Sequence, residues 1–348
     1  MSQPPAATGG LGFALFGAGR IGHVHAAAIA ASDRARLACV YDVDAGAATA
    51  LAGRYGVPVA GSVEAALATA GADAVLIASS TPTHLDLMLA ATAAGRPTLC
   101  EKPLDLDLAA VDRRRDEILG TEVPVQIGFQ RRYDSGHANL FRELRAGAVG
   151  ELQQVVVTSR DPGPPPAEYL AVSGGLFRDM MIHDFDVARW LTGEEPEQLA
   201  AFGAPLLDAD AQALDDVDTA MVILRMPSGV QCHINCARQA PYGYDQRIEV
   251  LGASGMLISA NLYQTGLQRF TATGTTVRDR LVDFFLERYA DAYRAEMDDF
   301  VDAVLSGRAP AVGYDDGRQA LALADAADRS RRSGQTVRPA PLANAASS

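Results

Sequence analysis

One short stretch near the start of the chain limits its possible folds more than any other. Residues 17–22 read GAGRIG, between an apolar run at residues 12–17 typical of a strand and a helix expected over residues 20–31. In that position a G-x-G-x-x-G motif allows a tight turn, lets a pyrophosphate approach the backbone and packs helix on strand. The helix start would then bind the phosphates. We therefore expect a dinucleotide site rather than a glycine-rich turn without a ligand, with contacts from Gly17, Gly19, Arg20, Ile21 and Gly22.

An acidic residue follows the second expected strand, which covers residues 36–41. Asp42 stands directly after this strand, and no arginine follows nearby. A carboxylate in this place can accept hydrogen bonds from the ribose hydroxyls of NAD, and it would repel the 2′-phosphate of NADP. The pattern favours NAD over NADP, the alternative being a solvated acid without a ligand.

Strand and helix signals alternate along the first 125 residues. Further strands are expected at residues 57–60, 74–78, 98–100 and 125–128, and helices at residues 45–55, 63–70, 84–94 and 108–119. Such alternation is typical of a doubly wound parallel sheet. We expect a Rossmann domain over residues 1–128.

The pattern changes after about residue 146. β-type runs occupy residues 152–160, 219–225, 230–238, 246–251, 256–260 and 266–272, several of them joined by tight-turn signals. Strands linked by hairpins form antiparallel sheets. With helices expected at residues 178–191, 283–305 and 314–332, residues 129–348 are predicted to form a second α/β domain with an open, mostly antiparallel sheet. Whether the last helices pack back on the first domain is left open.

Composition narrows the functional class. The formal net charge is −13 without a basic stripe, so we expect no nucleic-acid partner. No apolar run approaches the roughly 18 residues of a membrane span, and the start of the chain lacks the features of a signal peptide. The four cysteines form no C-x-x-C pair, which fits a reducing compartment. These features predict a cytoplasmic protein.

No metal site is expected. Cys232, His233 and Cys236 fall in one expected strand, where alternate residues face opposite sides and cannot converge without distortion. His23 and His25 are two positions apart on a helix and do not share a face.

Hydroxyl-bearing residues follow the expected strand at residues 74–78. A loop at the carboxyl edge of a parallel sheet is a common place for ligand contacts. A plain helix start, with Thr83 as its N-cap, would explain the same residues. We expect cofactor contacts from Ser79, Ser80 and Thr81, and from His84 because it follows them.

A charged pair, Glu101-Lys102, follows the next strand at the same edge and precedes Pro103. A lysine there can bind a substrate hydroxyl and can have a lowered pKa if partly buried. Taken alone, a lysine is more often a surface charge. We place both residues beside the cofactor, with Lys102 also contacting substrate.

An acid and a histidine lie four residues apart in the helix expected at residues 178–191. That spacing puts Asp179 and His183 on one face. A histidine oriented by a carboxylate can take the proton that must leave when an alcohol is oxidised. The alternative is an ion pair without a catalytic role.

The order GAGRIG, Asp42, EKP and GGLFRDMMIHDFDVARWL resembles the Gfo/Idh/MocA oxidoreductase family over residues 12–332. The stretches QIGFQRRYD, SRDPGPPP and YGYDQRIEVLG resemble the inositol 2-dehydrogenases within it. The resemblance implies a nicotinamide cofactor and a second domain that binds a polyol and builds an oligomer, usually a tetramer. Carried over by position, it implies that Lys102 contacts the reacting hydroxyl and that His183, paired with Asp179, exchanges the proton. It also places four residues near the substrate: Gln130, Arg131, Asp161 and Tyr244.

These implications predict the NAD-dependent oxidation of myo-inositol to 2-keto-myo-inositol (scyllo-inosose). Another polyol or sugar remains an alternative, such as scyllo-inositol, glucose or an anhydrosugar. So does redox-assisted elimination, in which NADH is recycled. A non-catalytic NAD-binding regulator is a third alternative, against which the intact Lys102, Asp179 and His183 argue.

Overall fold

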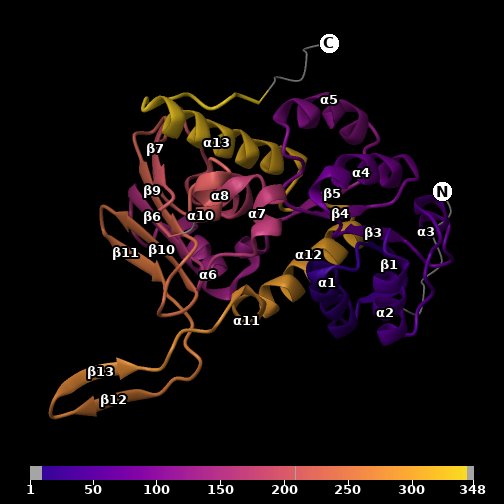
Figure 1. The fold of residues 1–348 in the computed structure, drawn as a ribbon, viewed down its shortest axis with the longest axis horizontal. Helices are drawn as coiled ribbons and strands as arrows, with labels where there is room; N and C mark the ends of the chain where they lie inside the picture. The colour runs from indigo at the N-terminus through magenta and orange to yellow at the C-terminus, as the bar shows by residue number, and fades with distance from the viewer. Residues whose placement is uncertain (1–9, 208, 343–348) are drawn as a thin grey trace. The chain divides into compact units, whose positions relative to one another are not determined.

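The computed structural model describes residues 10–207 and 209–342 (Figure 1). The chain divides into two compact units: residues 1–130 with 290–318, and residues 131–289 with 319–348. The expected boundary at residue 128 lies close to the first division, whereas residues 290–318 belong to the first unit and not to the second. Residues 1–9, where the sequence predicts no signal peptide, lie outside the described part. Among the described residues, no helix is long and apolar enough to cross a membrane.

The first unit is built on a five-stranded sheet in which all neighbouring strands are parallel. Its strands are β1 (Leu11–Phe16), β2 (Ala35–Tyr41), β3 (Ala74–Ile77), β4 (Thr98–Glu101) and β5 (Val125–Gly128), in the order β2-β1-β3-β4-β5. Every residue of β1, β3, β4 and β5 is buried, as expected for parallel strands covered on both faces. The strand order reverses between β1 and β3, which is where such sheets bind ligands.

Helices of the first unit follow its strands. They are α1 (Arg20–Ala31), α2 (Ala45–Tyr55), α3 (Val63–Leu67), α4 (His84–Ala93) and α5 (Leu108–Leu119), with the 3₁₀ turns η1 (Thr81–Thr83) and η2 (Gln130–Tyr133), the last of which continues into the second unit. The strand expected at residues 57–60 is wrong. An isolated bridge joins Val59 to Val40 there, because Pro58 has no N–H to extend a ladder.

Helix α12 (Ala290–Ser306) returns from late in the chain to the core of the first unit. It packs against α1, and its Met297, Phe300 and Val301 are fully buried. The Phe300 ring lies 5.9 Å from the ring of Phe13 in β1. This apolar face explains why the first unit includes a segment far along the sequence.

The second unit is built on a six-stranded sheet. Its strands are β6 (Leu152–Arg160), β7 (Gln198–Ala204), β8 (Thr219–Arg225), β9 (Gln231–Ala237), β10 (Asp245–Gly252) and β11 (Gly255–Ser259), in the order β11-β10-β6-β9-β8-β7. β6 and β9 pair in parallel, and the other neighbours are antiparallel. The predicted α/β class, with a parallel and a mostly antiparallel sheet, is confirmed.

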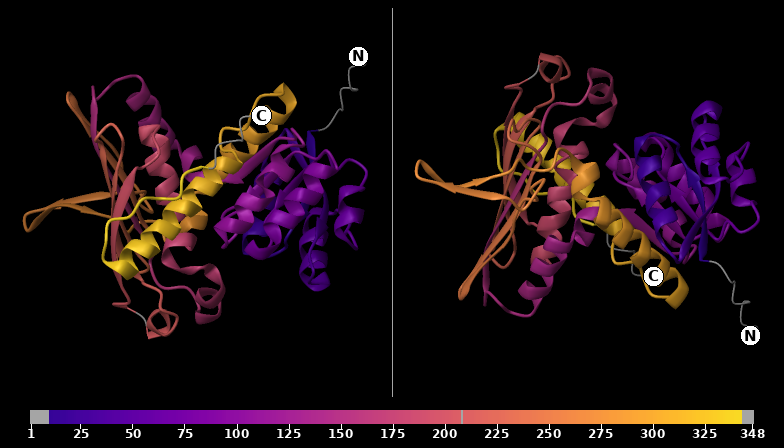
Figure 2. Two further views of the ribbon diagram at one scale, coloured as in Figure 1. Left: turned by 90° about the horizontal axis from the view of Figure 1, so that it is seen from above. Right: turned by 90° about the horizontal axis from the view of Figure 1, so that it is seen from below.

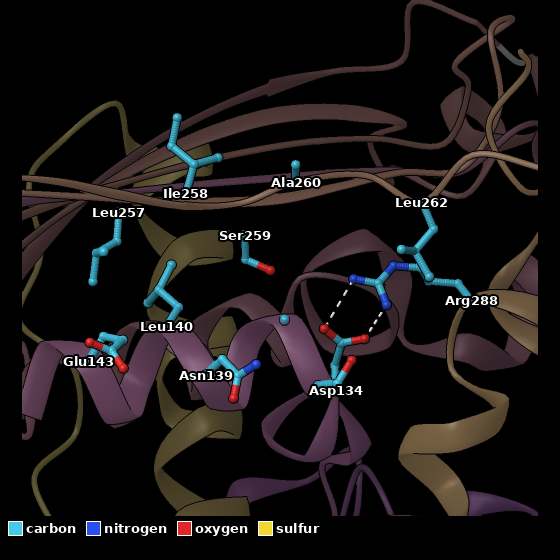
Figure 3. A pocket seen from close by; sticks show the side chains of 12 residues that line it. Asp134, Asn139, Leu140, Glu143, Leu257, Ile258, Ser259, Ala260, Leu262 and Arg288 are labelled. Atoms are coloured by element: carbon cyan, nitrogen blue, oxygen red, sulfur yellow. Dashed lines mark hydrogen bonds and ion pairs between the residues drawn. The ribbon is translucent and has the colours of Figure 1, made fainter. Parts of the chain in front are cut away.

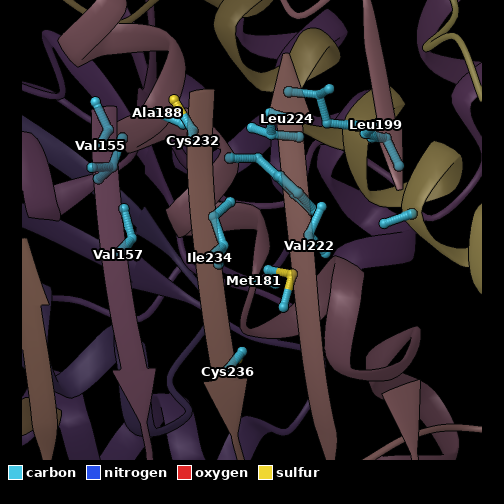
Figure 4. Close-up of a cluster of buried hydrophobic side chains, with 14 of the residues drawn as sticks. Val155, Val157, Met181, Ala188, Leu199, Val222, Leu224, Cys232, Ile234 and Cys236 are labelled. Carbon is cyan, nitrogen blue, oxygen red and sulfur yellow. The ribbon is translucent and has the colours of Figure 1, made fainter. Parts of the chain in front are cut away.

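Helices cover one face of this sheet and leave its other face bare (Figure 2). The covering helices are α6 (Ser135–Arg145), α8 (Gly175–Asp179), α9 (Ile182–Thr192) and part of α13 (Tyr314–Ser333). Valine, leucine and isoleucine side chains of β6, β8 and β9 point toward the helices and form the core with Met181 (Figure 4). The remaining short elements are α7 (Ala167–Ser173), α10 (Ala209–Ala213), α11 (Phe285–Arg288) and a hairpin of β12 (Gln268–Thr271) and β13 (Gly274–Arg278).

The single helix expected at residues 178–191 is wrong, because the chain forms two helices there. The backbone N–H groups of Met180 and Met181 both donate to the carbonyl of Leu176, so an extra residue enters the turn. Asp179 therefore ends α8, and His183 lies in the first turn of α9. Their relation is set by this turn and not by an ideal helical face.

The role of α12 gives a test of the first unit's core. Replacing Phe300 by alanine should cost about 3–5 kcal/mol, so calorimetry should show an unfolding temperature lower by at least about 6 °C. Leu305→Ala, at an exposed position of the same helix, is the matched control and should have little effect. An unchanged unfolding temperature for Phe300→Ala would contradict this placement of α12.

Candidate active site

The glycine loop of the first unit has the shape that a pyrophosphate site requires. Gly17 has a φ of +104°, and a Cβ there would lie 2.5 Å from the backbone of Ala78. A Cβ on Gly22 would lie 2.1 Å from the Gly17 carbonyl oxygen, whereas nothing lies within 4 Å at Gly19. Helix α1 begins without a side-chain cap or an acid in its first turn. Its first N–H groups are thus available to an anion.

Asp42 is fixed beside this loop at the carboxyl end of β2. One carboxylate oxygen accepts the N–H of Ala18 at 2.6 Å, and the other accepts the N–H of Asp44 at 2.8 Å. A carboxylate has about four acceptor sites, so capacity remains for ribose hydroxyls. The arrangement fits NAD, which supplies a hydride-accepting nicotinamide when bound.

The hydroxyl-bearing loop after β3 begins directly against Gly17, since a Cβ on Gly17 would also touch the Ser79 nitrogen. Ser79 and Thr83 share a hydroxyl hydrogen bond of 2.6 Å, and Ser80 and Thr81 lie at the start of η1. This places all four side chains at the switch point of the sheet.

His84 follows this loop as the first residue of α4. Its ring is buried, with Nδ1 2.8 Å from the Pro103 carbonyl oxygen and Nε2 3.1 Å from that of Ser79. Burial lowers the pKa of His84, so the neutral ring donates to one of these two oxygens. The ring thus lies between the Ser79 and Pro103 carbonyl groups, and its expected contact with the cofactor stays a prediction.

Glu101 and Lys102 lie at the same carboxyl edge. Glu101 is buried at the end of β4, and its carboxylate binds His25 Nε2 at 2.8 Å and the Lys102 N–H at 3.2 Å. The Lys102 side chain is half-buried, and Gln130, just past β5, is buried. The first unit therefore gathers its predicted site residues at one sheet edge.

A buried charged cluster underlies the site residues of the second unit. Arg131 donates to Asp184 at 2.5 Å and to Ser159 at 3.0 Å. Burial raises the pKa of Asp184 to about 6, although the Arg131 charge opposes that rise. Both terminal nitrogens of Arg131 bind protein groups, so its guanidinium supports this cluster, and its expected substrate contact stays a prediction.

Asp179 is held from two sides. Its carboxylate accepts the Tyr169 hydroxyl at 2.7 Å and the Arg238 Nη1 at 3.1 Å. His183 is largely buried at the start of α9. The structure thus keeps the predicted acid and histidine on successive helices.

Asp161 and Tyr244 complete the predicted set in this unit. Asp161 follows β6, and its N–H donates to the Ala237 carbonyl at 2.9 Å. Burial, and next the charge of Asp179, raise the pKa of Asp161 to about 7. Tyr244 is buried with its ring against those of Phe284 and Tyr289.

Sequence reasoning missed several members of this cluster, namely Ser159, Asp184, Asp216 and Arg238. Asp184 follows His183 directly, so its position offered a signal. The others gave none, because they reach the site through the parallel pairing of β6 with β9 and the turn before α8. Among the described residues, no group of three or more His, Cys, Asp or Glu could hold a metal ion.

A separate cavity of about 360 Å³ lies between α6 and β11 (Figure 3). The ion pair of Arg288 and Asp134 closes one end, and Leu257, Ser259 and Asn139 are among its other lining residues. None of the predicted site residues lines it. The cavity therefore adds nothing to the site.

Comparison with known proteins places this geometry in context. A family model described as an oxidoreductase family with an NAD-binding Rossmann fold matches residues 11–129. A second model, of the GFO/IDH/MocA C-terminal domain, matches residues 137–258.

Similarity extends over nearly the whole chain. Inositol 2-dehydrogenase of Rhizobium meliloti is 44% identical over 91% of this chain and 96% of its own length. The crystal structure of a myo-inositol dehydrogenase from Corynebacterium glutamicum superposes with a TM-score of 0.91 at 39% identity, over 96% and 100% of the two chains. That of scyllo-inositol dehydrogenase from Lactobacillus casei, with NAD(H) and scyllo-inositol bound, gives 0.86 at 27% identity over 94% and 99%.

The position of Asp42 leads to a test of cofactor choice. Replacing it by alanine removes charge-assisted hydrogen bonds, each of which is worth about 1.5–3 kcal/mol. Titration calorimetry should then show NAD⁺ binding weakened by roughly tenfold or more, with a smaller preference over NADP⁺. Asp73→Ala is the control, since Asp73 also accepts a backbone N–H but at the opposite end of β1. Equal NAD⁺ affinity in Asp42→Ala and wild type would contradict the assignment.

Proposed function

Since the chain belongs to the Gfo/Idh/MocA oxidoreductase family, we propose that it oxidises a ring hydroxyl of a cyclic polyol with NAD⁺, with myo-inositol as its substrate. Two arrangements carry the proposal. The first is the Gly17 loop with Asp42 beside it, and the second is Asp179, held by hydrogen bonds at the end of α8, with His183 in the first turn of α9. The dehydrogenases reported above support the choice of an inositol, and the product would be 2-keto-myo-inositol.

The proposed chemistry divides among three side chains. His183 takes the proton of the reacting hydroxyl as the carbon-bound hydrogen leaves as hydride to NAD⁺, which yields a ketone. Asp179, held by Tyr169 and Arg238, orients the base and favours its protonated form. Lys102 donates a hydrogen bond to the reacting oxygen, and Glu101, which accepts the Lys102 N–H, fixes the local backbone.

The polar groups of the second unit suit a neutral ligand with many hydroxyls. Asp161, Asp179 and Tyr244 can accept or donate hydrogen bonds, and the carboxylates would disfavour an anionic substrate. Gln130 of the first unit adds an amide. Another polyol with the same groups, such as scyllo-inositol, remains the second candidate because the Lactobacillus casei neighbour was crystallised with it.

An assay of NADH formation tests this function. Myo-inositol should give NADH, with scyllo-inositol, glucose and an anhydrosugar run alongside and NADP⁺ compared with NAD⁺. His183→Ala should lower kcat by about 10²–10⁴-fold, the usual contribution of a general base. His233→Ala, a partly exposed histidine on β9, should retain activity. Wild-type kcat in His183→Ala would overturn the role of this residue, and silence on every substrate would favour a regulator.

We also propose that the chain forms a homotetramer through the bare face of the second unit's sheet. Large apolar side chains are exposed on it: Phe202, Met221, Ile223, Met256 and Ile258. Phe202 and Met221 are register partners on β7 and β8, so with Ile223 they form a continuous patch at that edge, while Met256 and Ile258 lie on β11 at the opposite edge. Exposed apolar patches mark protein interfaces. The four free, buried cysteines support the accompanying proposal of a cytoplasmic location.

Light scattering after gel filtration tests the assembly. Wild type should have four times the chain mass of 36.6 kDa, whereas Met221→Glu with Ile223→Glu should shift the mass toward dimer or monomer because charge is costly in a buried interface. Leu305→Glu in the first unit, also an exposed apolar position, should leave the mass unchanged. A monomeric wild type would contradict the proposal.

A further inference from the structure

Arg238 is a buried arginine whose side chain donates a hydrogen bond to Asp179. It follows β9, is 1% exposed, and its backbone N–H donates to the Asp218 carbonyl at 2.8 Å. Its Nη1 donates to Asp179 at 3.1 Å, and its Nη2 lies 4.0 Å from an oxygen of Asp216, beyond hydrogen-bonding distance. The guanidinium therefore lies between two carboxylates.

A third carboxylate is brought to this place by the sheet. Arg160 of β6 is the register partner of Ala237 of β9, so Asp161 and Arg238 are the next residues along two parallel neighbours. The hydrogen bond from the Asp161 N–H to the Ala237 carbonyl continues that pairing. One guanidinium thus serves Asp161, Asp179 and Asp216.

The edge of the guanidinium formed by Nε and Nη2, which is nearest Asp216, binds no carboxylate through both nitrogens. Arg238 Nε and Nη2 make no hydrogen bond to the described residues, and neither does one oxygen of Asp216. Elsewhere the same edge of an arginine binds a carboxylate through both nitrogens, as Arg318 does with Asp112 at 2.8 and 3.0 Å. Asp216 is instead held by the Leu176 N–H at 3.0 Å, near the start of α8.

We propose that Arg238 is a positioning residue, which fixes Asp179 at the end of α8 and supplies the one positive charge that Asp161, Asp179 and Asp216 share. This inference rests on the proposed function at one point, namely that Asp179 orients the base His183. Charges buried without a partner are costly. Three carboxylates around one guanidinium therefore leave an excess negative charge, which a proton can neutralise.

Asp161 is the group on which that proton would reside. Its pKa is raised to about 7, first by burial and next by the charge of Asp179, while Arg238 and Arg131 act in the opposite direction. Groups of the second unit that face this cluster are Asp179 of α8, Asp184 of α9, Arg131 of η2, Arg238 and Cys236 at β9, and Tyr244. Without the Arg238 charge, the pKa of Asp161 should rise further, and the site should need a higher pH to become ionised.

The pH profile of kcat/KM for myo-inositol tests this role with the full-length enzyme. In Arg238→Met, the limb on which activity rises with pH should move up by about one unit or more, and kcat should fall at least tenfold. Arg238→Lys keeps the charge, so its limb should stay in place while kcat falls because a point charge cannot hold two carboxylates. Arg238→Met with Asp216→Asn should return the limb toward wild type. Arg247→Met, an exposed arginine on β10 paired with Asp245, is the control.

Infrared difference spectra of the protein without substrate make the outcome independent of activity. The signal of protonated carboxyl groups at pH 7 should increase in Arg238→Met, and this increase should be lost when Asp161→Asn is added. A folded Arg238→Met variant with an unmoved limb and an unchanged carboxyl signal would overturn the inference. If the wild type oxidises no polyol, the proposed function fails while the infrared result still decides the role of Arg238. If Arg238→Met does not fold, the same two readouts on Arg238→Lys and the double variant decide it.

Discussion

Buried charge is the constraint on which the second unit depends. Arg131 and Asp184 form an ion pair of 2.5 Å with both side chains almost fully buried, and Arg238 and Asp179 form another. Removing such ions from water costs several kcal/mol each, which close pairing offsets only when the partners are held in place. The ends of β6 and β9, the turn between α8 and α9, and η2 are therefore fixed with respect to one another within this unit.

In the first unit, close packing of the backbone fixes the segments that form the site. Gly17 lies so near Ala78 and Ser79 that no larger residue fits, which holds the glycine loop against the loop after β3. His84 then joins that loop to Pro103, beside Lys102. Because a buried histidine such as His84 is costly to the fold unless its ring is hydrogen-bonded, its place between these loops is better explained by the site that it supports than by stability.

Local sequence patterns predicted much of the fold and part of the candidate site. The bounds of α1, α2 and α5 follow from apolar periodicity and flanking residues, and the GAGRIG loop meets the structural context that its motif requires. Long-range features could not be read in the same way. The parallel pairing of β6 with β9 brings Arg238 to Asp161, the Met180–Met181 turn separates two helices, and α12 joins the first unit through apolar contacts that no local pattern reveals.

The proposed function requires these groups to serve a hydride transfer from a polyol carbon to NAD⁺. Myo-inositol deuterated at C2 tests it most directly. We expect mass spectrometry to find the deuterium in NADH, and kcat/KM to show a primary isotope effect at pH values where chemistry limits the rate. NADH that carries no deuterium, or turnover of the deuterated substrate without net NADH, would contradict this hydride transfer.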